Sequence, residues 1–166
     1  RESILAGVRN RYVKEMEGKE ISDDLLPGFE LIKNWNLRAD SLNTSAALSI
    51  LTLPNAFKPE NLKYDRDSIT VKLRENMSYL KKQYGRIDVP LGRVVRLVRG
   101  ETSLPLSGGP GTLRAIYSKK SGKNYKAVAG DCYIQAVEWG PEGQLNAWSI
   151  HQYGSSTMDK TSSHFD

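Results

Sequence analysis

Apolar residues in the first half of the chain recur with the spacing of α-helices. The clearest case lies between residues 66 and 84, where apolar side chains return every third or fourth position. This spacing places them on one face of a helix of about five turns. The stripe consists of Ile69, Leu73, Met77, Leu80 and Tyr84.

The residues that flank this stripe favour the same helix. Asp65 or Asp67 can cap its start, because a carboxylate accepts hydrogen bonds from the first free N–H groups. Lys81 and Lys82 suit the negative end of the helix dipole, and Gly85 can adopt the left-handed conformation that ends a helix. We therefore expect a long amphipathic helix that stops at residue 84 or 85.

Two shorter helices are expected before it. One covers about residues 23–38, with Pro27 tolerated in its first turn, and the other covers about residues 41–51 and ends before Pro54. The segment from Pro54 to Asp65 is expected to be a loop. The apolar positions behind these two predictions are Leu25, Leu26, Phe29 and Ile32, and then Leu42, Ala46, Ala47, Ile50 and Leu51.

The second half of the chain has the pattern of β-strands. Residues 125–139 and 144–153 are two runs rich in aromatic and β-branched residues, joined by Gly-Pro-Glu-Gly, which predicts a hairpin. Apolar residues occupy both alternating positions, so we expect both faces to be buried. A two-stranded ribbon cannot bury its own two faces. The three predicted helices are enough to cover only one of them. These residues are Tyr133, Ile134, Val137, Trp139, Trp148 and Ile150.

The order of these elements predicts an α+β chain. Residues 1–85 are expected to be mainly helical and residues 86–166 mainly strands and turns, within a single unit. The length of 166 residues and the hydrophobic content of 39% fit one ordinary domain. No apolar run approaches the roughly 18 residues of a membrane helix, and we expect no membrane partner. Because the chain begins with Arg1, it is compatible with a piece of a longer protein.

The net charge of +5 raises the question of nucleic-acid binding. The Lys and Arg clusters are small, lie apart and alternate with Glu, and no nucleic-acid-binding motif accompanies them. We therefore expect a solvated basic surface and no nucleic acid as partner. A non-enzymatic binding or scaffold module that uses this basic surface for an anionic partner remains the alternative function.

A glycine-rich stretch at residues 104–113 raises the question of a phosphate-binding loop. Its sequence is Leu-Pro-Leu-Ser-Gly-Gly-Pro-Gly-Thr-Leu. A P-loop requires Lys after its last Gly, and a dinucleotide-binding loop requires G-x-G-x-x-G before a helix. The stretch has neither. Gly108, Gly109 and Gly111 instead allow a tight backbone path that Pro105 and Pro110 stiffen.

Other chemistry finds little support in the residue types. Cys132 is the only cysteine, so an internal disulfide and a cysteine-rich zinc module are both excluded. One cysteine and two histidines are too few to indicate a thiolate–imidazole pair of Cys132 with His151 or His164, oriented by Asp131 or Asp159. No spacing typical of metal ligands occurs, and no metal or cofactor is expected. The hydroxyl-rich tail from residue 151 is expected to be a polar loop.

Three stretches taken in succession resemble the C-terminal part of the penicillin acylase family. They are the glycine-rich stretch 104–113, the hairpin region 127–156 and the ending Ser-Ser-His-Phe-Asp. The family closes its β chain with a Pro-Leu-x-Gly-Gly-x-Gly-Thr-like stretch, a hairpin, a turn like G-Q-S-G and a motif like S-P-H-Y-x-D-Q. The residues at matching positions, all with an expected structural role, are Gly108, Gly109, Gly111, Thr112, Gly154, Ser156, Ser162 and His164.

Residues 25–48 are also similar to a helix of the family with the pattern L-x-x-W-D-x-R-x-D-x-x-S, with Trp35, Arg38, Asp40 and Ser41 or Asn43 in place. The match has departures. The turn reads Gly-Ser-Ser-Thr at residues 154–157, Ser163 replaces the proline before the histidine, and Asn36 replaces the aspartate after the tryptophan.

The resemblance implies an N-terminal nucleophile amidohydrolase with an αββα sandwich. Such enzymes cleave amides of acylated amines, such as β-lactam side chains or N-acyl-homoserine lactones, and are typically periplasmic or secreted. Their nucleophile is the first residue of the β chain, and an Asn side chain completes the oxyanion hole. Residue 1 here is Arg, so the catalytic residues are expected upstream, in the remainder of the enzyme. Asn34 and Asn36 match the family's later helix and are not expected to form the oxyanion hole.

Overall fold

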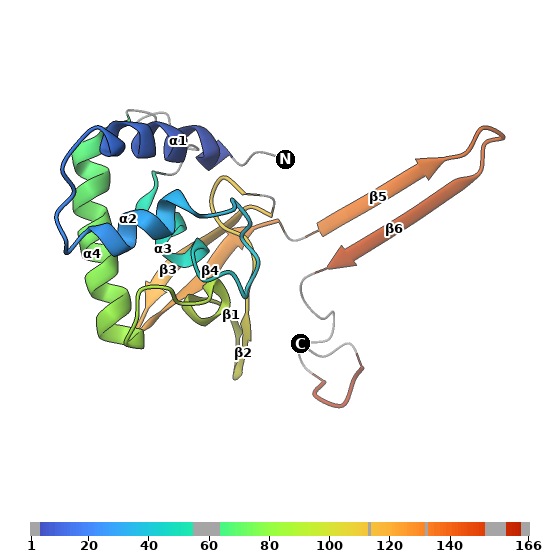
Figure 1. The fold of residues 1–166 in the computed structure, drawn as a ribbon. Helices are drawn as coiled ribbons and strands as arrows, with labels where there is room; N and C mark the ends of the chain where they lie inside the picture. The colour runs from blue at the N-terminus through green and yellow to red at the C-terminus, as the bar shows by residue number, and fades with distance from the viewer. Residues whose placement is uncertain (1–3, 55–63, 113, 132, 152–158, 164–166) are drawn as a thin grey trace.

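The computed structural model describes residues 4–54, 64–112, 114–131, 133–151 and 159–163, and its helices precede its strands (Figure 1). This order confirms the predicted α+β class. The change from helices to strands falls between residues 85 and 94, as expected. The elements are α1 Ile4–Glu17, α2 Leu26–Lys33, α3 Ala46–Thr52, α4 Arg66–Tyr84, α5 Leu91–Val94, β1 Val95–Arg99, β2 Thr102–Pro105, β3 Ile116–Ser121, β4 Asn124–Gly130, β5 Tyr133–Trp139 and β6 Leu145–His151.

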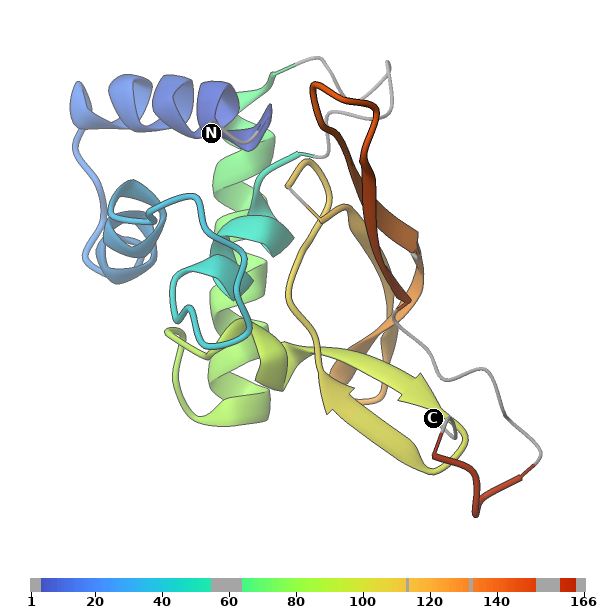
Figure 2. The same ribbon diagram turned by 90° about the vertical axis from the view of Figure 1, so that its right-hand side faces the viewer.

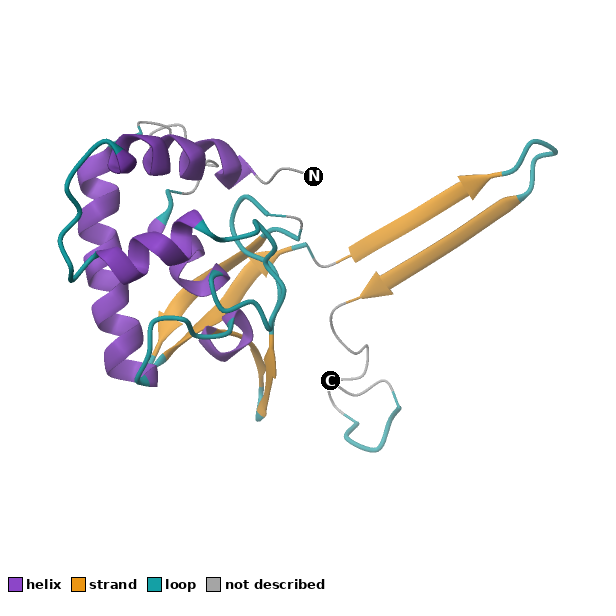
Figure 3. Ribbon diagram, viewed as in Figure 1, coloured by secondary structure: helices purple, strands orange, loops and turns teal. Residues whose placement is uncertain are grey.

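The strands form two separate sheets. Sheet A has the order β2–β1–β4–β3, with β1 parallel to β4 and the other neighbours antiparallel. The strands β5 and β6 form an antiparallel hairpin of their own. The helices lie on one side of sheet A, and the hairpin extends away on the other side (Figures 1 and 3). In Figure 2, turned by 90°, the strands of sheet A lie to the right of α4.

The hydrophobic core lies between the helices and the inner face of sheet A. Its largest fully buried side chain is Trp35, and Val95 and Ile116 contribute from the sheet. The sequence of α4 forms this helix as predicted: Ile69, Leu73 and Leu80 are buried. Other members of the core include Leu5, Tyr12, Phe29, Ile32, Leu48, Val89, Leu91 and Val94.

The two ends of α4 are also formed as predicted. The carboxylate of Asp65 accepts hydrogen bonds from the N–H groups of Asp67 (3.2 Å) and Ser68 (3.3 Å). Gly85 follows the helix with a left-handed φ of 78°, and its N–H donates to the carbonyl of Lys81. Capping at both ends therefore sets the length of this helix.

The prediction of a helix over residues 23–38 is wrong in its bounds. α2 covers only Leu26–Lys33, and the N–H of Asn34 closes its last turn on the carbonyl of Glu30. Trp35 is buried from the loop that follows, where its indole N–H donates to the carbonyl of Arg38 at 2.9 Å. An apolar position at helical spacing can thus be filled by a side chain that lies outside the helix.

The helix expected over residues 41–51 begins later. α3 starts at Ala46, because the side-chain oxygen of Asn43 accepts hydrogen bonds from the N–H groups of Ser45 (3.0 Å) and Ala46 (3.1 Å). Leu42, which was expected on the apolar face, is 80% exposed. The helix α1 was not predicted at all. The loop expected between Pro54 and Asp65 lies mostly outside the described residues.

Candidate interaction surface and the glycine-rich loop

The β5–β6 hairpin exposes apolar side chains on both of its faces. One face carries the cross-strand pairs Ile134–Ile150 and Ala136–Trp148. Ile134, Ile150 and Trp148 are 40%, 60% and 58% exposed. Because these pairs are adjacent along the ribbon, they make one continuous apolar patch.

The opposite face has a second patch at the far end of the ribbon. There Trp139 pairs with Leu145, and Val137 pairs with Ala147. Trp139 and Leu145 are among the most exposed apolar side chains of the described chain, at 72% and 60%. Tyr133 adds a half-exposed ring at the near end of the same face.

The hairpin itself confirms the sequence prediction, but its surroundings do not. Residues 125–139, which were expected to form one strand, are divided between two strands. β4 belongs to sheet A, and β5 does not. Both faces, expected to be buried, are open to solvent in this chain. Exposed apolar surface of this kind is characteristic of an interaction site. The hairpin is therefore the candidate interaction surface.

Most of the glycine-rich stretch lies in the loop between β2 and β3, and this loop is hydrogen-bonded to the segment before α3. The N–H of Gly108 donates to the carbonyl of Ala39 at 2.6 Å, and the N–H of Gly109 donates to the hydroxyl of Thr112 at 2.8 Å. The N–H of Thr112 donates back to the carbonyl of Gly109. These N–H groups therefore form hydrogen bonds within the protein.

Glycine is required in this loop by close packing. Gly108 has a φ of 106°, and a Cβ atom there would lie 2.6 Å from the carbonyl oxygen of Arg114. A Cβ atom on Gly109 would lie 2.9 Å from the side chain of Ile50 in α3. The loop thus holds the start of β3 against the helical layer. Gly108, Gly109 and Thr112 therefore contribute packing and hydrogen bonds to this loop.

The two asparagines beside Trp35 have local structural partners. The side-chain amide of Asn34 donates to the carboxylate of Glu30, a residue of α2, at 3.1 Å. The side-chain oxygen of Asn36 accepts from the N–H of Arg38 (3.1 Å) and from the amide of Asn43 (2.8 Å). Both side chains therefore stabilise the loop between α2 and α3.

The remaining residues from the sequence hypotheses lie mostly outside the described part of the chain. This applies to Cys132, Gly154, Ser156 and His164. His151 is the last residue of β6 and pairs with Tyr133. Asp131 accepts a hydrogen bond from the N–H of Ala115 at 2.9 Å, and Asp159 accepts from Thr161, so the described carboxylates have structural partners. Ser162 lies in the turn after Asp159.

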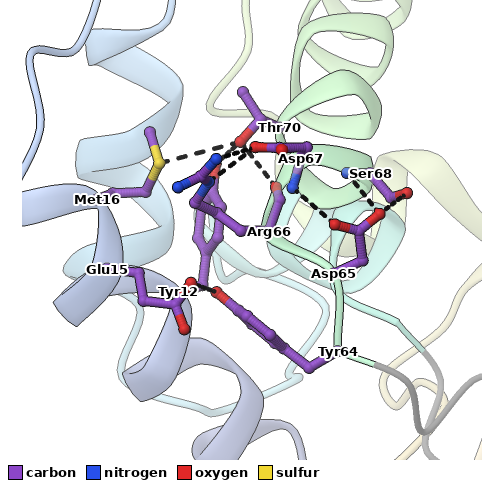
Figure 4. Close-up of polar contacts among 9 residues, drawn as sticks. All are labelled: Tyr12, Glu15, Met16, Tyr64, Asp65, Arg66, Asp67, Ser68 and Thr70. Carbon is purple, nitrogen blue, oxygen red and sulfur yellow. Dashed lines mark hydrogen bonds and ion pairs between the residues drawn. The ribbon is translucent and has the colours of Figure 1, made fainter.

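A polar cluster joins α1 to α4 (Figure 4). The hydroxyl groups of Tyr12 and Thr70 are 3.1 Å apart, and the hydroxyl of Tyr64 donates to Glu15 at 3.1 Å. Burial, followed by the neighbouring Glu15 carboxylate, raises the pKa of Tyr64 to about 12. Tyr64 therefore stays a hydrogen-bond donor at neutral pH, which suits a clamp between helices rather than a general base.

Three tyrosines form a second junction, between α4 and the turn that joins β3 to β4. The hydroxyl groups of Tyr79 and Tyr84 both donate to the carbonyl of Lys123, at 2.7 and 2.6 Å. The ring of Tyr79 meets that of Tyr125 edge-on, with ring centres 5.8 Å apart. Burial raises the pKa values of all three phenols. The junction fixes sheet A on the helical layer.

A well-defined cleft lies beside α4 and is lined by apolar, charged and hydroxyl side chains. It has a volume of about 600 Å³, and its lining includes the apolar residues Pro27, Met77 and Ile87. Its charged rim contains the ion pairs Arg74–Asp24 and Arg86–Asp88. Across the described ranges, no group of three His, Cys, Asp or Glu side chains is placed to hold a metal ion. No described helix has the length and apolarity needed to cross a membrane.

Comparison with known proteins adds no family assignment. No protein-family model matches the chain, and no curated protein matches it.

Proposed function

We propose that this chain is the C-terminal part of an amidohydrolase similar to the penicillin acylase family. The proposal is supported by the succession of the glycine-rich stretch, the hairpin and the Ser-Ser-His ending in that order. It is further supported by a hairpin with apolar patches on both faces, since a ribbon inside a larger sheet structure requires both faces to be apolar. This hairpin is the observation that carries the proposal.

In this account the chain contributes helices and strands to an αββα sandwich and supplies no catalytic residue. The nucleophile and the oxyanion hole lie in the remainder of the enzyme, which is the partner that covers the hairpin. The substrate is an acylated amine, cleaved at its amide bond, and the enzyme acts in the periplasm or outside the cell. The glycine loop and the tyrosine junction hold the layers of this part together.

The proposal is tested with the precursor that contains this sequence. We expect the precursor to hydrolyse N-acyl amides, such as phenylacetyl amides or N-acyl-homoserine lactones. Exchange of the first residue of its β chain, which is usually serine in the family, for alanine should abolish the reaction, because that residue supplies both nucleophile and base. Equal hydrolysis by both proteins would overturn the assignment.

The interaction surface is tested in the same precursor. Trp148→Glu together with Ile150→Glu places charge on one apolar face of the hairpin, and this should prevent assembly and activity. Leu42→Glu with Val71→Glu is the matched control, because these residues are also more than half exposed but lie outside the hairpin. Normal activity of the hairpin variant would show that the hairpin is not an assembly surface.

A further inference from the structure

The outer face of sheet A, opposite the helices, carries a row of three cations. β1 and β4 place Arg96 beside Lys126, and β4 and β3 place Lys126 beside Lys119. Paired residues in a ladder share a face of the sheet, so three neighbouring strands present like charges side by side. The row arises from the strand order of sheet A, so the sequence alone does not predict that these three residues are neighbours.

These charges are not neutralised within the described chain. None of the ion pairs among the described residues involves Arg96, Lys119 or Lys126. The guanidinium of Arg96 donates to the carbonyl of Gly92 (2.9 Å) and to the hydroxyl of Ser103 (3.2 Å), which fixes its position without removing its charge. Both lysines are exposed.

Protection of a sheet edge does not explain the row. Lysine is common on edge strands, where it discourages pairing with other chains, and β3 is such an edge. Lys126 and Arg96, however, lie on the two central strands β4 and β1. Like charges directly opposite each other weaken a sheet, so the row has a cost in the free chain that an anionic partner would remove.

Apolar residues beside the row indicate what kind of partner fits. Val98 follows Arg96 by two positions on β1, and Val128 follows Lys126 by two positions on β4. Val128 is 53% exposed. A polypeptide offers both carboxylates for the cations and apolar side chains for the valines, whereas phosphates would satisfy only the cations.

We propose that this outer face is covered by an acidic polypeptide segment whose carboxylates lie against Arg96, Lys126 and Lys119. The proposal does not depend on the amidohydrolase function, because it follows from the charges of sheet A alone. It makes this face a second interaction surface, separate from the hairpin.

The test measures binding of a labelled deca-glutamate peptide to the chain of residues 1–166 by fluorescence anisotropy. We expect binding that weakens as salt is added. Lys119→Gln with Lys126→Gln should weaken it about tenfold, since two charge-assisted contacts are lost. Lys14→Gln with Lys19→Gln, which removes the same charge from exposed positions in and after α1, should leave binding unchanged.

Three results would overturn the proposal. Equal weakening in both double variants would indicate general attraction to a basic protein, and absence of binding at low salt would exclude the acidic segment. Tighter binding of a ten-nucleotide oligothymidylate, with the same dependence on Lys119 and Lys126, would assign the face to nucleic acid. Circular dichroism of each variant confirms that the fold is retained.

Discussion

At the scale of single residues, the glycine loop has the most exacting geometry. Gly108 has a positive φ, and in Gly108→Ala the added Cβ atom would lie 2.6 Å from the carbonyl oxygen of Arg114. We expect a loss of about 2 to 4 kcal/mol in the free energy of unfolding. Gly122→Ala is the matched control, because Gly122 also has a positive φ but has open space around it; it should lose only about 1 to 2 kcal/mol. Urea unfolding measures both, and equal losses would contradict the close packing.

Asp65 makes α4 sensitive to acid. Hydrogen bonds from the Ser68 hydroxyl and from the N–H groups of Asp67 and Ser68 lower the pKa of its carboxyl group. The stabilisation is therefore present above the unfolded pKa of about 3.9 and is lost as pH falls through the lower folded pKa. Asp65→Asn keeps the cap but cannot titrate. The wild type should lose more stability than this variant between about pH 5 and pH 2; parallel pH profiles in urea unfolding would contradict the assigned cap.

At the scale of elements, α4 was predictable because every local signal agrees. Its apolar stripe, Asp65 cap and Gly85 end are all read from neighbouring residues. α1 was missed because its buried residues Leu5, Tyr12 and Met16 are widely spaced among charges. The end of α2 was misplaced because Trp35 keeps helical spacing from Ile32 while it is buried from a loop. Burial and helical conformation are separate properties. The spacing of apolar residues indicates which residues are buried, and it does not show whether each of them lies in a helix.

The strands show where local patterns fail. The apolar run from Tyr125 to Trp139 looks continuous, yet Gly130 and Asp131 separate β4 from β5 through contacts with Ala115, a residue distant in sequence. The parallel pairing of β1 with β4 is likewise set by tertiary structure, so the cation row could not be predicted. Among the expected site residues, the glycines of the loop were recognisable because only glycine fits such a path.

The cation row has a consequence for the stability of the free sheet. Lys126→Gln removes the central charge of the row, and we expect it to raise the free energy of unfolding by about 0.2 to 1 kcal/mol at low salt. The gain should shrink as salt screens the repulsion. Lys72→Gln, on the exposed surface of α4, serves as control and should change stability little. Thermal unfolding at two salt concentrations decides this, and destabilisation by Lys126→Gln would contradict the repulsion.

At the scale of the whole molecule, the exposed hairpin should govern the solution behaviour of the chain. We expect residues 1–166 to bind a hydrophobic dye and to self-associate, because two apolar patches face solvent. Trp148→Glu with Ile150→Glu should reduce both, whereas Leu42→Glu with Val71→Glu should not. Dye fluorescence and sedimentation velocity give the two readouts. A monomeric chain that binds no dye would contradict an uncovered hairpin.

The central claim is that this chain needs a larger partner to act on acylated amines. The most direct measurement compares amide hydrolysis by the native protein, isolated with an antibody against residues 1–166, with hydrolysis by the chain alone. The account predicts release of amine from N-acyl substrates by the native protein and none by the isolated chain. Hydrolysis by the isolated chain, or an inactive native protein across phenylacetyl amides and N-acyl-homoserine lactones, would contradict it.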